Sequence, residues 1–178
     1  MHTARIIGLS LLAGMTGSAV AQNYPAKSIR VVAPFPAGGG TDLFARALAQ
    51  KLTAVFGQQV IVDNRSGAGG MIGSDMVARA APDGYTLLVT SSSTHSIAPH
   101  LTRKPLYDPL KDFAPVIEIA SAPNVLVVHP SLPVKTVKDL IDLARSRPGQ
   151  INYGSNGAGT LSHLTGELFK LQTRSNLV

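Results

Sequence analysis

The sequence predicts an α/β protein in which mostly parallel sheets are flanked by helices and the chain forms two lobes. Apolar runs of strand length alternate with segments of helical period, and a pattern of strand, small-residue turn and helix occurs twice. The two copies begin at residues 29–32 and 151–153. Because a Gly-rich turn that opens a helix leaves unpaired N–H groups at the positive end of the helix dipole, the two copies predict an anion held between two lobes.

The N-terminal residues predict a cleaved signal peptide at residues 1–21. One Arg and no acid precede an apolar stretch at 6–15, which is too short to span a bilayer, and Ala19-Val20-Ala21 fits the small-residue cleavage rule. No later apolar run approaches the roughly 20 residues of a spanning helix. We therefore expect an exported, periplasmic protein.

Composition excludes several classes of function. The chain has no Cys, which excludes disulfides, thiolate nucleophiles and Cys-ligated zinc. The formal net charge is +6, but no basic run is longer than Arg103-Lys104 and aromatic residues make up only 5%, so no nucleic-acid partner is predicted. A modest positive charge favours small anions.

The first lobe is predicted to span residues 22–121 and to follow the order β-α-β-α-β. Strands are expected at 29–33, 60–62 and 85–90, and helices at 41–56 and 71–80. Gly57 is a natural helix stop, and the turn Pro82-Asp83-Gly84 announces the third strand. This order is typical of a parallel sheet with helices on its faces.

The second lobe is predicted to begin at residue 122 and to be incomplete at 178. The apolar runs 116–120 and 125–128 predict two strands that cross between the lobes, and 136–145 predicts an amphipathic helix. Residues 176–178 resemble a strand just beginning. Because so few residues cannot close a core of their own, we expect a truncated lobe.

Enzyme motifs fail on inspection. The glycines at 67–73 do not form a dinucleotide fingerprint because Ile72 replaces a required Gly, and no Walker loop is present. Tyr153 occupies the first Gly position of a nucleophile elbow. No His spacing matches a metal site. We therefore predict no catalytic residue, no metal and no cofactor.

The mature chain resembles the tripartite tricarboxylate transporter substrate-binding proteins, also called Bug receptors. Motifs at family-like spacing run in order along it: Val31-Val32-Ala33-Pro34-Phe35-Pro36-Ala37-Gly38-Gly39-Gly40-Thr41-Asp42, Val62-Asp63-Asn64-Arg65 with Gly67-Ala68-Gly69-Gly70, Pro82-Asp83-Gly84-Tyr85-Thr86, and Tyr153-Gly154-Ser155 with Ser162-His163-Leu164. The resemblance implies a two-lobed periplasmic binding protein of type II that closes on a small carboxylate. Family members are considerably longer than this chain.

The resemblance implies ligand-binding residues on three loops. The first-lobe loop comprises Phe35, Ala37, Gly38, Gly39, Gly40, Thr41 and Asp42, whose backbone donors would meet a carboxylate directly or through water. The loop after the third strand comprises Ser91, Ser92, Ser93 and Thr94. The second-lobe loop comprises Ser155, Asn156, Gly157, Gly159, Thr160 and His163.

An ionised Asp42 cannot itself bind a carboxylate. Its alternative roles are to cap the helix N-terminus, to pair with Arg46 one turn on, or to accept from the ammonium group of an amino-acid ligand. His163 either orients a ligand or packs. These roles stay open at the level of sequence.

The favoured function is a receptor that captures a small carboxylate and delivers it to the membrane permease of a tripartite tricarboxylate-type transporter. We expect a monomer. Two alternatives remain: an exported α/β enzyme acting on an anionic metabolite, and a non-functional fragment of the receptor. An activated nucleophile or base with an orienting partner would indicate the enzyme, and the sequence offers none.

Overall fold

A three-stranded parallel sheet forms the centre of the N-terminal part of the molecule. The computed structural model describes residues 24–178, so the predicted signal peptide at 1–21 lies outside the described residues. The strands are β1 (Ile29–Ala33), β2 (Val60–Asn64) and β3 (Thr86–Leu88), in the order β2-β1-β3. Both neighbours of β1 run parallel to it, which confirms the predicted parallel sheet.

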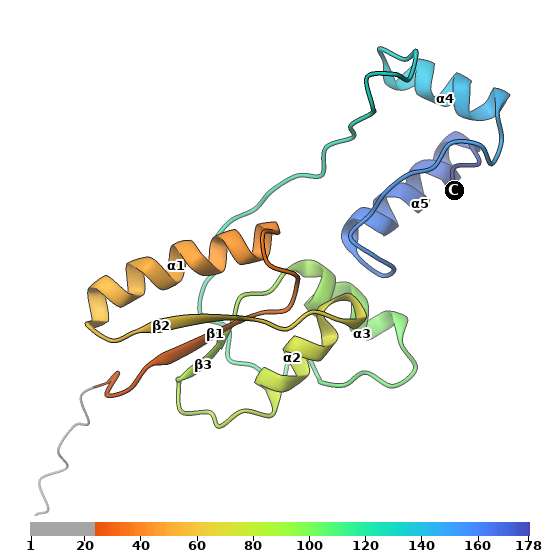
Figure 1. Cartoon of the computed structure of the whole chain (residues 1–178). Coiled ribbons are helices and arrows are strands. Elements are labelled where there is room, and N and C mark those ends of the chain that lie inside the picture. The colour runs from red at the N-terminus through yellow and green to blue at the C-terminus, as the bar shows by residue number, and fades with distance from the viewer. Residues whose placement is uncertain (1–23) are drawn as a thin grey trace, which may run out of the picture.

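Two helices connect the strands and pack on the sheet. They are α1 (Gly40–Phe56) and α2 (Met71–Ala78), which lie on opposite sides of β1 in Figure 1. The first crossover runs from β1 to β2 and the second runs back past β1 to β3, and right-handed crossovers in opposite directions along a sheet place their helices on opposite faces. The core beneath α1 contains Val31, Ala33, Ala45 and Val89. The predicted β-α-β-α-β order is confirmed.

The turns at the carboxyl ends of the strands fold into short helices. Between β2 and α2 lies the 3₁₀ turn η1 (Ala68–Gly70), and after β3 come the π-helical turn η2 (Ser93–Ile97) and α3 (Ala98–Leu101). Tyr107 is buried beside η2 and donates its hydroxyl to the carbonyl oxygen of Thr94. These turns gather at one edge of the sheet.

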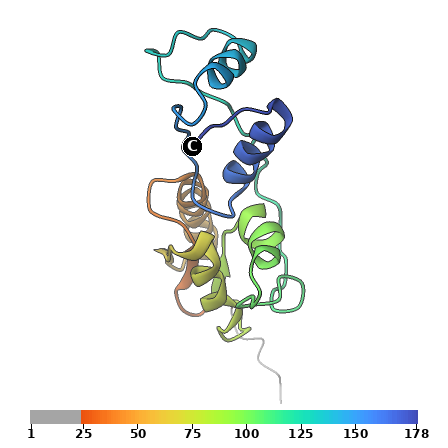
Figure 2. The same ribbon diagram turned by 90° about the vertical axis from the view of Figure 1, so that its right-hand side faces the viewer.

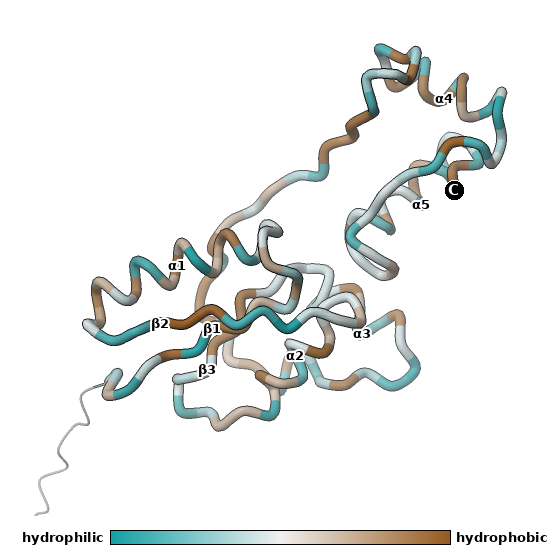
Figure 3. Tube along the Cα trace, in the orientation of Figure 1, coloured by the Kyte–Doolittle hydropathy of each residue, from teal (hydrophilic) through white to brown (hydrophobic). Residues whose placement is uncertain are grey.

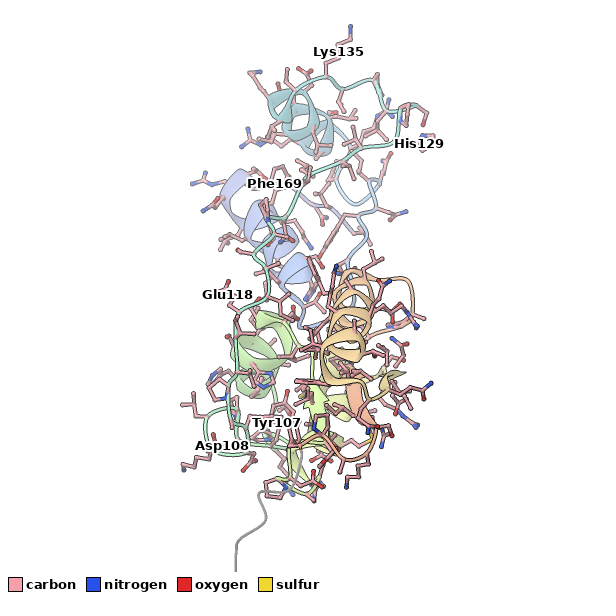
Figure 4. The ribbon with its side chains drawn as sticks, turned by 90° about the vertical axis from the view of Figure 1, so that its left-hand side faces the viewer. Tyr107, Asp108, Glu118, His129, Lys135 and Phe169 are labelled. Atoms are coloured by element: carbon pink, nitrogen blue, oxygen red, sulfur yellow. The ribbon has the colours of Figure 1, made fainter. Side chains whose placement is uncertain are left out.

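The predicted strands at 116–120 and 125–128 are wrong. Residues 113–129 form no regular secondary structure, and residues 114–131 are all exposed. Figure 3 shows hydrophobic stretches along this connecting segment, and Figure 4 shows Glu118 and His129 along its course between Asp108 and Lys135. An apolar β-branched run forms a strand only beside a partner that completes its hydrogen-bond ladder, and no strand of the described residues lies beside this one.

The C-terminal part contains α4 (Val137–Ser146) and α5 (Leu161–Thr173). A reciprocal capping box of Thr136 and Asp139 begins α4, in agreement with the predicted helix. The strands expected near 151–153 and 176–178 appear as one parallel bridge between Ile151 and Leu177. None of the helices within residues 24–178 has the length and apolarity to cross a membrane.

Candidate functional site

The loops that follow β1, β2 and β3 meet at the carboxyl edge of the sheet. Gly70, from the loop after β2, lies directly against Thr94 from the loop after β3 and Phe35 from the loop after β1. A Cβ atom on Gly70 would clash with Cγ2 of Thr94 and would lie 3.2 Å from Cζ of Phe35. Open α/β sheets place their ligands at this edge. The structure therefore brings the first two predicted loops together.

The loop after β1 is organised around Asp42. This carboxylate is only 3% exposed, and its Oδ2 accepts from the N–H of Gly38 at 2.9 Å and from Nε of Arg46 at 2.9 Å. Its Oδ1 accepts from Nδ2 of Asn64 at 3.0 Å. Of the predicted alternatives, the pair with Arg46 is confirmed. The Gly38 N–H is committed to Asp42.

Hydrogen bonds keep Asp42 ionised. The bonds from Arg46, then Gly38, then Asn64 lower its pKa from 3.8 to about 2, although burial opposes them. Both carboxylate oxygens of Asp42 therefore already accept hydrogen bonds from the protein itself.

The backbone donors that remain for an anion lie at the start of α1. Gly39, at the N-cap of α1, has no side chain to accept from the first turn. The N–H groups of Gly40 and Thr41 have no intrahelical acceptor, and no other group among residues 24–178 accepts from them. Residues 37–40 are exposed. The start of α1 therefore offers two adjacent amide donors at the positive end of a 17-residue helix.

The serine-rich loop after β3 divides into exposed and buried residues. Ser92 is exposed and Ser91 is half-buried, whereas Ser93 and Thr94 are buried. The hydroxyl of Thr94 donates to the carbonyl oxygen of Ser91 at 3.0 Å, which fixes the turn. Neighbouring His95 is partly buried, which lowers its pKa. Ser93 is the member of this loop that faces the C-terminal part of the chain.

The second-lobe loop is held by its own side chains. Thr160 is buried at the N-cap of α5, accepts from the N–H of His163 and donates to the carbonyl oxygen of Gly157 at 2.6 Å. Nδ1 of His163 accepts from the N–H of Gly159 at 3.2 Å. Ser155 accepts from the N–H of Gly157 at 3.3 Å. His163 thus braces the loop.

One hydrogen bond joins the two lobes at the candidate site. The N–H of Leu161, the first residue of α5, donates to Oγ of Ser93 at 3.0 Å across 68 residues of sequence. A Cβ on Gly69 would lie 3.6 Å from the carbonyl oxygen of Ala158. Figures 1 and 2 show the loop before α5 above the same sheet edge at which α1 begins. The structure therefore places the N-termini of α1 and α5 near the same edge of the sheet, the edge at which its strands end.

Asn64, Gly69 and Gly70 lie at the site although they are not among the residues that the sequence predicts for it. The glycine turn after a predicted strand was a signal for the last two, because an open α/β sheet places its ligand in such turns. Asn64 had no such signal, because its role depends on the distance between two strands. Within residues 24–178, no three His, Asp or Glu side chains gather as a metal site.

A family model and the curated relatives of this chain point to the same kind of protein. Residues 44–178 match the family model described as tripartite tricarboxylate transporter family receptor. Protein BugT of Bordetella pertussis (strain Tohama I) is 43% identical over 171 residues, which cover 94% of this chain and 52% of BugT.

Solved structures are similar in fold as well as in sequence. R. palustris Rpa4515 with adipate is 42% identical with a TM-score of 0.84, and MatC from Rhodopseudomonas palustris with bound malate is 32% identical with a TM-score of 0.79. Each alignment covers 87% of this chain and 52% or 53% of the other. The chain thus spans about half the length of the relatives it matches.

Proposed function

The chain belongs to the tripartite tricarboxylate transporter receptor family, and from that premise we propose that it contributes to a receptor that binds a small carboxylate between two lobes. The first lobe comprises residues 22–121 and the second begins at residue 122. The observation that carries the proposal is the Leu161–Ser93 hydrogen bond, which joins the N-terminus of α5 to the loop after β3. Rpa4515 and MatC, whose structures contain adipate and malate, support a carboxylate as the ligand class.

Binding follows from preorganised backbone donors. The amides of Gly40 and Thr41 at the start of α1 take one carboxylate group, directly or through water. The serine hydroxyls of the loop after β3 and the side-chain donors of Ser155 and Asn156 in the loop before α5 complete the shell. Because these donors are already fixed, they replace the water of the anion at low entropic cost. The ligand is held without chemical change.

Delivery of the ligand requires partners beyond this chain. We infer that the receptor acts in the periplasm after cleavage of the signal peptide at 1–21, and that its closed form presents the carboxylate to the permease subunits of a tripartite tricarboxylate-type transporter. The receptor acts as a monomer, and neither nucleic acid nor a cofactor takes part.

A thermal-shift titration tests this function. Adipate and malate are added to the purified protein, and hexane-1,6-diol, which has the chain length of adipate but no carboxylate, serves as the control. A ligand that binds only the folded state stabilises it by about 2.7 kcal/mol at one hundred times its Kd, so we expect the melting temperature to rise with at least one acid and not with the diol. No rise with any carboxylate would contradict receptor function for this chain.

A further inference from the structure

Asn64, the last residue of β2, ties together both ends of the loop that follows β1. Its Nδ2 donates to the carbonyl oxygen of Phe35 at 3.1 Å and to Oδ1 of Asp42 at 3.0 Å. Phe35 begins the loop and Asp42 lies in the first turn of α1, so one side-chain amide fixes the entry and the exit of the same segment.

Arg46 closes these contacts into a ring. Its Nε donates to Oδ2 of Asp42 at 2.9 Å, and its Nη2 donates to Oδ1 of Asn64 at 3.2 Å. The same Oδ2 accepts from the N–H of Gly38, whose φ of +85° would strain any other residue. The ring of Asn64, Asp42 and Arg46 therefore holds the loop at its start, its middle and its end.

We propose that Asn64 is a positioning residue which, through the ring with Asp42 and Arg46, presets the loop so that the amides of Gly40 and Thr41 are aligned before a carboxylate arrives. The role rests on the proposed function, because it concerns the same loop. In this role Asn64 acts on the ligand through its contacts with the loop. A loop fixed in its bound shape binds more tightly, because ordering costs nothing further at the moment of binding.

If electrostatic repulsion dominated, replacing Asp42 would change the affinity for an anion in the opposite direction. Asp42 places a negative charge beside donors meant for an anion, so its removal would strengthen anion binding if charge alone mattered. Under the positioning role, Asp42→Asn loosens Gly38 and weakens binding despite the removal of the repelling charge. The direction of the change in affinity therefore separates the two accounts.

The test compares Asn64→Ala and Asp42→Asn with a matched control. Asp75→Asn removes a second Asp–Arg pair at the same helical spacing, since Asp75 accepts from Nε of Arg79 at 2.9 Å on α2. Adipate affinity is measured by calorimetry, and exchange of the Gly38 amide hydrogen by NMR. We expect about ten-fold weaker adipate binding and about ten-fold faster Gly38 exchange in both ring variants, with neither change in Asp75→Asn.

Arg46→Gln provides a milder variant in case Asn64→Ala does not fold, because the Arg46 side chain is 55% exposed. It should weaken adipate binding and speed Gly38 exchange in the same direction. A purely structural role would lower the melting temperature of the ring variants and leave the Kd unchanged. That result, or tighter adipate binding by Asp42→Asn, would overturn the proposal.

Two different measurements distinguish failure of the proposed function from failure of the positioning role. If the wild-type chain binds neither adipate nor malate, the receptor function fails for this chain, while Gly38 exchange still measures the ring in the free protein. Unchanged Gly38 exchange in Asn64→Ala and Arg46→Gln would overturn the positioning role whatever the ligand does.

Discussion

Asp42 illustrates how one residue can carry a charge at an anion site without opposing it. Its oxygens accept hydrogen bonds from Arg46, Gly38 and Asn64, and these bonds lower its pKa to about 2. The carboxylate is therefore ionised throughout the physiological range, and its charge is balanced locally by Arg46. The contribution of Asp42 to the free energy of unfolding should therefore vanish in acid.

The stability provided by Asp42 should depend on pH in a defined direction. Its pKa is lower in the folded state than its ordinary value of 3.8, so its contribution is present above that value and is lost as the pH falls through about 2. We expect the difference in free energy of unfolding between wild type and Asp42→Asn to shrink from pH 4 to pH 2, measured by urea unfolding. Exposed Glu118, on the connecting segment, supplies the control Glu118→Gln. A difference that stays constant would contradict the pairing.

Ser93 should couple the two lobes through its hydroxyl. Ser93→Ala removes the acceptor of the Leu161 N–H. Because a hydrogen bond contributes about 0.5–1.5 kcal/mol net, exchange of the Leu161 amide hydrogen should rise by about two- to ten-fold. Ser92→Ala, at the exposed neighbour, should leave it unchanged. Equal exchange in both variants would show that this hydrogen bond does not hold the lobes.

At the scale of the element, the glycine turn after β2 permits the three loops to meet. Gly70 has a φ of +94° and lies against Thr94 and Phe35, so both its conformation and its space require the absence of a side chain. The closeness of η1 and η2 therefore depends on this one position.

Gly70→Ala should destabilise the protein. The new methyl group must displace Thr94, and the backbone must adopt a left-handed conformation, which together should cost about 1–3 kcal/mol in the free energy of unfolding. Urea unfolding measures it. Gly154→Ala is the matched control, since no atom lies within 4 Å of the added Cβ and its φ is ordinary. Equal stability of the two variants would refute the packing argument.

Element prediction from sequence was accurate where local pattern decides structure. The expected helix at 41–56 is α1 in the structure, and the strand at 29–33 is β1, because their apolar spacing matches the period of each element. Residues 116–120 and 125–128 have the composition of strands but pair with nothing described. Strand formation depends on a partner far along the chain, and no local pattern reveals it.

The candidate site was predictable only in part for the same reason. Residues 38–42 and 157–160 are candidates from sequence because glycine turns before helices have a recognisable pattern. The roles of Asn64 and Ser93 arise from contacts across 22 and 68 residues, so only the folded arrangement reveals them.

At the scale of the whole molecule, a long exposed connection separates two bodies. Val116 is 85% exposed and Val127 is 79% exposed, and Figure 3 shows hydrophobic stretches along the segment that connects the sheet to α4. Among residues 24–178, this segment has neither regular secondary structure nor burial to protect its backbone.

Limited proteolysis should therefore cut this connection first. Thermolysin, which cleaves before bulky apolar residues, is expected to cut within residues 116–128 while α1 and α5 remain intact. Mass spectrometry of the early fragments locates the cut. First cleavage inside α1 or α5 would contradict the assignment of residues 113–129 as an unpaired connection.

The central claim is that donors from both lobes bind one carboxylate ligand. An NMR titration of the isotope-labelled protein with adipate tests it most directly, through the amide signals of Gly40, Thr41, Gly157 and Leu161. We predict that signals at the starts of α1 and α5 shift together with a single Kd. Shifts confined to one loop, or found only around the groove lined by His95, Tyr107 and Asp112, would contradict it.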